Sequence, residues 1–302
     1  MSLRRRRPQI NQSSRNKTQR APSRAVTPIP VVGGTGMLAR YADFPSWHVL
    51  SRHVDIWLPP AYEVAPEVRY PVIYLHDGQN LFDPASSFIG VDWGLDEAIR
   101  RVIRDERLPG AILVGIWNSP LRLREYMPDK PLLNPDAWGL RAEFIQEADG
   151  EPLSESYLRF LVEELKPFVD ATYRTLPEPS HTSVMGSSMG GLISLYALIE
   201  YPEIFGGAGC LSTHWSIGRE ALVDALGAAL PRAGRHRLYF DFGTETLDAA
   251  YEPYQQRMDG WLRAASYEAE QDWVTRKFVG AEHSERAWRA RVHIPLAFLL
   301  RR

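Results

Sequence analysis

A serine set between closely spaced glycines is the strongest chemical signal in the sequence. Residues 184–192 read Val-Met-Gly-Ser-Ser-Met-Gly-Gly-Leu and contain G-x-S-x-G centred on Ser188. An apolar run rich in β-branched residues precedes the motif, and apolar residues at helical spacing follow it. Strand, tight turn and helix in this order predict a nucleophile elbow, which presents a serine hydroxyl at the end of a sheet. The alternative is a Gly/Ser-rich turn that only packs.

A serine hydroxyl is a weak nucleophile at neutral pH, so it needs a base, and the base needs an orienting acid. On an α/β sheet both should follow the serine in the chain, each in a loop after a strand. His283 lies between the last predicted strand and the last helix and is the predicted base. The acid should follow the strand predicted at 237–242. Asp248 is preferred over Glu245, although Asp248 could also serve only as a helix N-cap.

Two backbone N–H groups should stabilise the oxyanion that forms when a serine attacks a carbonyl. Met189, directly after the nucleophile, is predicted to supply one. Gly78 or Gln79, in the turn after the strand predicted at 70–76, should supply the other, and the sequence leaves the choice open. A glycine in this turn would let a substrate approach the backbone closely.

Predicted strands and helices alternate along the chain, which indicates a doubly wound, mostly parallel sheet. The fold is expected to begin near Trp47. The long stretch 118–150 lacks a period and is predicted to be an excursion over the face of the sheet. The strands are expected at 49–58, 70–76, 111–117, 182–185, 205–211, 237–242 and 273–279. Helices are expected at 93–107, 153–173, 192–201, 220–230, 248–265 and 285–300.

Charge and composition limit the function classes of this chain of 302 residues. Residues 1–28 are predicted to be a disordered basic tail, and residues 29–302 a single domain. Nine Arg and Lys precede Asp43, the first acid, so the body is acidic and is not expected to bind nucleic acid. Cys210 is the single cysteine, which excludes an intrachain disulfide and a cysteine-based zinc site. No membrane span or signal peptide is recognised, so a cytoplasmic location is predicted; the oligomeric state is left open.

Four segments together resemble the putative esterase family: residues 74–83, 185–192, 201–206 and 280–285. That family includes enterochelin (siderophore) esterases, esterase D-like hydrolases, feruloyl esterases and mycolyltransferases, and the resemblance is greatest to the enterochelin-esterase-like branch. It implies a three-layer α/β-hydrolase fold, with helices on both faces of a mostly parallel central sheet. It also implies a Ser-Asp/Glu-His mechanism on a small-molecule ester, without metal or organic cofactor. Ser188 and His283 fall on the family's nucleophile and base, and Asp248 precedes a long helix, as the family's acid does.

The resemblance and the chain order also suggest residues that bind substrate. Similar proteins carry an Asn…Arg…Glu-Tyr stretch after the strand predicted at 111–117, which points to Asn118, Arg122, Arg124 and Tyr126. An arginine here could hold an anionic or catecholate substrate by paired hydrogen bonds, or could simply pair with a nearby acid on the surface. The last candidates follow the strand after the elbow, where His214 could line the pocket. Trp215 could form a wall of the pocket or could be a packed aromatic.

The predicted function is therefore a serine esterase that forms an acyl-enzyme. An acyltransferase with the same triad is one alternative, because the chemistry up to the acyl-enzyme is shared. A non-catalytic, hydrolase-like binding protein is the other. The sequence does not identify the ester.

Overall fold

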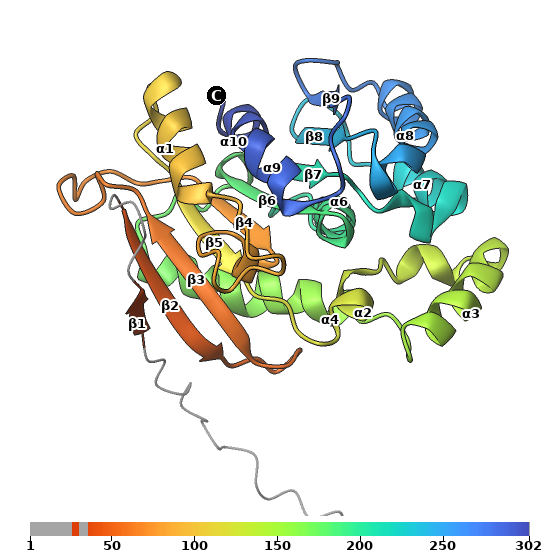
Figure 1. The fold of residues 1–302 in the computed structure, drawn as a ribbon, viewed down its shortest axis with the longest axis horizontal. Helices are drawn as coiled ribbons and strands as arrows, with labels where there is room; N and C mark the ends of the chain where they lie inside the picture. Colours follow the sequence, from red (N-terminus) through yellow and green to blue (C-terminus); the bar gives the residue numbers. More distant parts are fainter. Residues whose placement is uncertain (1–25, 30–35, 302) are drawn as a thin grey trace, which may run out of the picture.

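The computed structural model describes residues 26–29 and 36–301. Within that part of the chain, one sheet of nine strands runs through the molecule in the order β1-β2-β3-β5-β4-β6-β7-β8-β9 (Figure 1). Its strands are β1 (Val26–Ile29), β2 (Met37–Phe44), β3 (Arg52–Leu58), β4 (Val72–His76), β5 (Ile112–Ile116), β6 (Thr182–Ser187), β7 (Gly207–Leu211), β8 (Arg237–Phe242) and β9 (Trp273–Lys277).

The direction of the strands divides the sheet into two parts. β1, β2, β3 and β5 pair antiparallel at one end. From β5 to β9 every pairing is parallel. β4 and β5 are buried along their whole length, as expected for strands covered on both faces. Because parallel strands end at one edge, the loops after β4 to β9 are brought together there.

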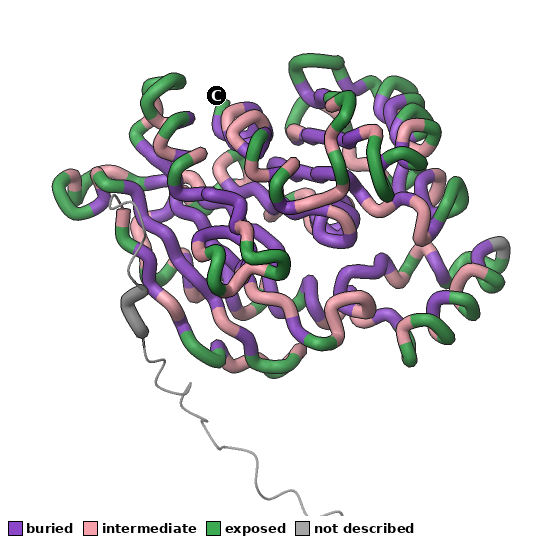
Figure 2. Tube along the Cα trace, viewed as in Figure 1, coloured by how far each residue is buried: buried purple, intermediate pink, exposed green. Residues whose placement is uncertain are grey.

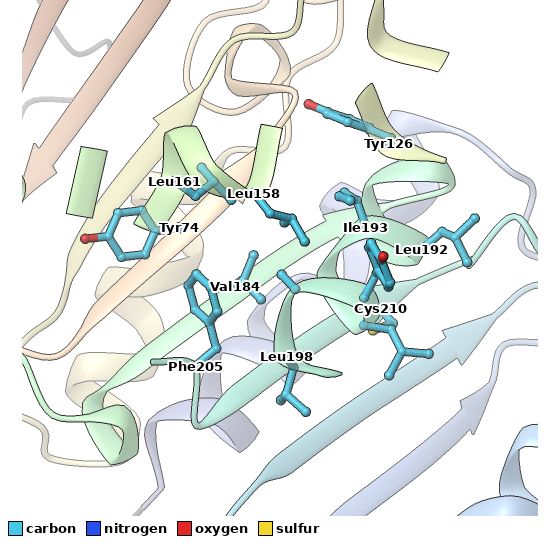
Figure 3. Close-up of a cluster of buried hydrophobic side chains, with 14 of the residues drawn as sticks. Tyr74, Tyr126, Leu158, Leu161, Val184, Leu192, Ile193, Leu198, Phe205 and Cys210 are labelled. Carbon is cyan, nitrogen blue, oxygen red and sulfur yellow. The ribbon is translucent and has the colours of Figure 1, made fainter. Parts of the chain in front are cut away.

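Helices cover both faces of the sheet and make two hydrophobic cores. Ile73 and Leu75 of β4 pack with α1, α9 and α10, whereas Val72 and Tyr74 face the opposite core with α6. Figure 3 shows part of the second core, in which Val184 of β6 lies between Leu158 and Phe205. The helices are α1 (Leu95–Asp105), α2 (Arg122–Tyr126), α3 (Trp138–Glu147), α4 (Ser154–Arg159), α5 (Lys166–Thr172), α6 (Met189–Glu200), α7 (Arg219–Ala228), α8 (Glu252–Ala264), α9 (Glu285–Arg291) and α10 (His293–Leu300). This arrangement confirms the predicted three-layer α/β fold.

The start of the fold differs from the prediction. It does not begin near Trp47, because β2 already pairs with β3 and buries Leu38, Tyr41 and Phe44. Arg40 of β2 also forms two hydrogen bonds with the buried Asp55 of β3, at 2.7 and 2.8 Å. Residues 26–28, assigned to the basic tail, lie in β1, and residues 1–25 lie outside the described residues.

Several helical segments differ from the predicted boundaries. The stretch 118–150 contains α2, α3 and two single 3-10 turns, and Figure 2 shows α3 as largely exposed or half-buried. Only Phe144 of α3 is buried, which explains the missing apolar period. The helix predicted at 153–173 passes from α4 to α5 through a π-helical turn, Phe160–Leu165. The last predicted helix is divided into α9 and α10 at Val292.

Candidate active site

A pocket of about 530 Å³ opens at the edge of the sheet where the parallel strands end. Its walls come from the loops after β4, β5, β6 and β9, together with the start of α9. The lining includes Gln79, Asn118, Arg122, Ser187, Ser188 and His283. Ser187, the residue before the predicted nucleophile, also lies in the pocket wall.

Ser188 forms a sharp turn between β6 and α6. Its backbone angles are φ 57° and ψ −123°, a strained combination for a residue with a side chain. A Cβ on Gly186 would lie 2.8 Å from the backbone of Gly190, so the glycine is required where the turn folds back on itself. The Ser188 N–H donates to Leu211 O at 2.9 Å, which anchors the turn to β7.

His283 and Asp248 are directly hydrogen-bonded to each other. His283 Nδ1 lies 2.6 Å from Asp248 Oδ1, although 35 residues separate them in the chain. The Asp248 side chain has no exposed surface. Because an ionised carboxylate only accepts hydrogen bonds, Nδ1–H is the donor, and Nε2 is left with a lone pair that can take a proton.

Three donors hold the Asp248 carboxylate. Besides His283, Ser212 Oγ donates to Oδ2 at 2.6 Å and the Gly243 N–H donates to Oδ2 at 2.5 Å. Burial acts to raise the pKa of Asp248, but the hydrogen bonds from His283, Ser212 and Gly243 outweigh it and leave the pKa below its usual value. The acid is therefore ionised at neutral pH and can orient a histidine.

The loops that carry the predicted acid and the predicted base are joined to each other. The N–H groups of Thr244 and Glu245 both donate to Ala281 O at 3.0 Å. The His283 N–H donates to Thr246 Oγ1 at 2.8 Å. The Glu245 side chain is exposed and the His283 ring pairs with Asp248, which favours Asp248 of the two acid candidates.

A second group of buried polar residues is linked to Asp248 through Ser212, and the sequence did not reveal it. Ser212 Oγ accepts from Trp288 Nε1 at 3.0 Å and from Arg291 Nη2 at 2.8 Å. The same guanidinium forms a buried ion pair with Asp241 at 3.0 Å. Trp288 and Arg291 lie three residues apart on α9, soon after His283. That spacing places both on one helix face and was the available signal.

The predicted oxyanion donors lie at the starts of two helical turns. Met189 is the first residue of α6, so its N–H has no acceptor within the helix. Gly78 and Gln79 begin a 3-10 turn, Gly78–Asn80, in which the first closing bond is from Asn80 N to Asp77 O. Gln79 lines the pocket. The reason for the glycine differs from the one expected: a Cβ on Gly78 would lie 2.6 Å from the backbone of Gly115, so close packing on β5 requires it.

Arg122 holds the turn after β4 in place through an ion pair with Asp77. Its Nε and Nη2 donate to the two Asp77 oxygens, each at 2.7 Å, and Asn118 Nδ2 donates to Oδ1 at 2.6 Å. Burial acts to raise the pKa of Asp77, but Arg122 outweighs it and holds the pKa below its usual value. Arg122 therefore pairs with an acid of the pocket wall and not with a surface acid, and because it also lines the pocket its binding of substrate stays a prediction.

Three of the candidate binding residues are placed away from the pocket. Arg124 donates to Glu151 O at 2.7 Å and lies on the surface. Tyr126 has no exposed surface and packs on Tyr157, with ring centroids 5.2 Å apart. Trp215 is 1% exposed and stacks on Phe240 in the core, so of its two alternatives it is the packed aromatic. Arg124 and Tyr126 are corrected to residues that lie outside the pocket.

His214 lies beside His283, although it is not part of the described pocket lining. Its ring centroid is 6.5 Å from that of His283, and its Nδ1 is 2.6 Å from the Tyr251 hydroxyl. Burial, then the positive charges of His283 and Arg122, lower the pKa of His214 to about 4. It is therefore neutral at pH 7.

Two absences complete the description of the site. Within residues 26–29 and 36–301, no group of three His, Cys, Asp or Glu side chains could hold a metal ion. Over the same ranges, the His283 ring is hydrogen-bonded to Asp248 and makes no hydrogen bond with the Ser188 hydroxyl. Such bonds are often long before substrate binds.

A family model described as putative esterase matches residues 50–294, most of the chain. The chain belongs to the putative esterase family. Membership in this family supports the hydrolysis of esters as the general type of activity.

Two curated relatives from Bacillus subtilis strain 168 are similar to this esterase-family chain. The uncharacterized protein YbbA is 26% identical over 196 residues, which are 65% of this chain and 69% of YbbA. Ferri-bacillibactin esterase BesA is 27% identical over 173 residues, 55% of this chain and 56% of BesA. The second match therefore spans only about half of each protein.

Solved structures share the fold. An IroE-like serine hydrolase from Shewanella oneidensis has a TM-score of 0.65 at 19% identity, over 87% of this chain and 80% of that one. A ferulic acid esterase has a TM-score of 0.61 at 16% identity, over 88% and 99%. No helix within the described ranges is long and apolar enough to cross a membrane.

The Arg122–Asp77 pair predicts a pH-dependent stability change. In Arg122→Gln, the Asp77 carboxylate keeps its burial but loses its counter-charge, so we expect unfolding free energy at pH 7 to fall by about 1.5–3 kcal/mol. Because the pKa of Asp77 is lowered in the folded wild type, its ionised carboxylate stabilises the fold at pH values above the usual carboxyl pKa. This contribution is lost as the pH falls through the lowered pKa. In the variant, we expect burial to outweigh the remaining hydrogen bond from Asn118 and to raise the pKa of Asp77, so that acid protonates the carboxyl and relieves the penalty. Urea unfolding should therefore show a smaller difference at pH 4 than at pH 7.

The control is Arg276→Gln, which removes an exposed pair with Glu270. It should cost under about 1 kcal/mol. An Arg122→Gln loss equal at both pH values would contradict this account of Asp77.

Proposed function

We propose that the chain is a serine esterase in which Ser188, His283 and Asp248 form a catalytic triad. The observation that carries the proposal is the 2.6 Å contact between His283 and the fully buried Asp248. It sets the tautomer of a histidine that lines the same pocket as Ser188. Membership in an esterase family supports the same conclusion.

The proposed reaction begins with attack of Ser188 Oγ on the ester carbonyl carbon. His283 Nε2 takes the serine proton, and Asp248 stabilises the imidazolium that forms. The tetrahedral intermediate collapses as His283 returns the proton to the leaving alcohol. Water, deprotonated by the same histidine, then attacks the acyl-enzyme and releases the carboxylic acid, which restores Ser188.

Two N–H groups are proposed to stabilise the oxyanion. Met189 contributes one from the start of α6, where the helix dipole also favours negative charge. Gln79 contributes the other, because it lines the pocket. Arg122 acts indirectly, since its two bonds to Asp77 hold the residue before this turn in a left-handed conformation, φ 56°.

The proposed substrate is a small-molecule ester. The names of the relatives supply test compounds: BesA is described as a ferri-bacillibactin esterase, and one solved structure as a ferulic acid esterase. A hydrolysis screen should therefore include a trilactone siderophore, feruloyl esters and simple acyl esters of increasing length.

Replacement of the nucleophile tests the reaction type. Ser188→Ala should lower kcat for p-nitrophenyl butyrate by more than about 10⁴-fold, because the variant has no nucleophilic side chain at this position of the turn. Circular dichroism should show a folded protein. The control is Ser187→Ala, which removes the neighbouring hydroxyl and should leave the enzyme active. Wild-type turnover in Ser188→Ala would refute the esterase assignment.

A matched pair of variants tests the acid. Asp248→Asn should lower kcat by about 10³- to 10⁴-fold, because Asn can hold His283 in the wrong tautomer. Glu245→Gln removes the same charge from an exposed side chain three residues earlier and should change kcat less than about twofold. A larger loss in Glu245→Gln than in Asp248→Asn would overturn the choice of acid.

A further inference from the structure

Glu285 is a buried carboxyl in the pocket wall that the proposed reaction does not use. It is the first residue of α9 and is 7% exposed. It lines the same pocket as Ser188 and His283. Among the described residues, its side chain has no hydrogen bond or ion pair beyond its own backbone N–H. Neither carboxyl oxygen is among the fully buried, unpaired side-chain atoms, so the carboxyl reaches the open pocket, where a partner could bind it.

The charges around Glu285 show which ligands could approach it. Burial, then the negative charge of Asp77, raise the pKa of Glu285, while His283 and Arg122 act in the opposite direction. All three of these groups line the pocket. The Arg122 guanidinium already donates to both Asp77 oxygens. An anionic substrate would therefore meet two carboxyls and an arginine whose charge is matched.

The position of Glu285 on its helix does not account for these features. An acid in the first turn of a helix is favoured by the helix dipole. An exposed glutamate would gain the same benefit without losing its hydration. Neither burial nor the position beside the nucleophile follows from the dipole, whereas both follow if the carboxyl contacts a ligand.

We propose that Glu285 accepts a hydrogen bond from a hydroxyl or ammonium group of the ester substrate, close to the scissile bond. The enzyme then prefers esters that carry such a donor and disfavours esters with a carboxylate at that position. The inference rests on the proposed esterase function and adds the substrate class. It also argues against an anionic ester, which was one of the substrates considered for Arg122.

Two series of matched esters test the preference on either side of the scissile bond. The acyl series is methyl 3-hydroxybutyrate, its apolar isostere methyl isovalerate, and monomethyl succinate. The alcohol series is 2-hydroxyethyl butyrate, its isostere propyl butyrate, and carboxymethyl butyrate. Acid release in a pH-stat gives kcat/KM for each ester. In at least one series, the wild-type enzyme should prefer the hydroxylated ester to its isostere by about tenfold.

Two substitutions separate the acceptor from the charge. Glu285→Leu removes both and should abolish the hydroxyl preference while the isostere is still hydrolysed. Glu285→Gln keeps an acceptor oxygen but removes the charge, so it should raise kcat/KM for the carboxylate ester about tenfold relative to the isostere. Should Glu285→Leu fail to fold, Glu285→Gln carries the test through the carboxylate ratio. Glu282→Gln is the matched control, because it removes an exposed acid three residues away and should leave every ratio unchanged.

The outcomes distinguish this inference from the proposed function. Ester hydrolysis that depends on Ser188, with the same ratios in wild type and both Glu285 variants, would overturn the role of Glu285 alone. No Ser188-dependent hydrolysis of any ester in either series would overturn both proposals.

Discussion

An ionised carboxylate without exposed surface is stable only when hydrogen-bond donors surround it, and Asp248 is such a group. Its donors come from three places in the chain: Ser212 after β7, Gly243 at the end of β8, and His283 after β9. Satisfying this one charge therefore fixes three loops relative to each other. The same requirement sets the tautomer of His283. The orientation of the His283 ring is therefore a consequence of where Asp248 is buried.

The same physical rule organises the rest of the pocket. Asp77 is matched by Arg122 on α2, which ties the turn after β4 to the excursion beyond β5. Asp241 is matched by Arg291 on α9, beneath the acid. Buried charges thus join elements that are distant in the chain at the edge of the sheet. Glu285 is an acid of the pocket wall without such a charged partner, and we propose that it contacts the substrate.

The sequence predicted those parts of the fold and site that depend on local pattern. The apolar runs of β4, β5 and β8 and the elbow at Ser188 are local signals, and chain order then pointed to His283 and Asp248. Residues whose role depends on a distant partner were not predictable. Arg122 pairs with a residue 45 positions away, and β2 is stabilised by pairing with β3. Trp215 was left open between a pocket wall and a packed aromatic, because its position after a strand does not reveal which way its ring points.

The central claim is that Asp248 and His283 activate Ser188, and the most direct measurement is covalent labelling. The wild-type protein should be treated with a fluorophosphonate and the adduct located by peptide mass spectrometry. We predict a single adduct on Ser188, not on the adjacent Ser187, forming at least about 100-fold more slowly in Asp248→Asn because the base is misoriented. No adduct, an adduct on Ser187, or an equal labelling rate in Asp248→Asn would contradict the account.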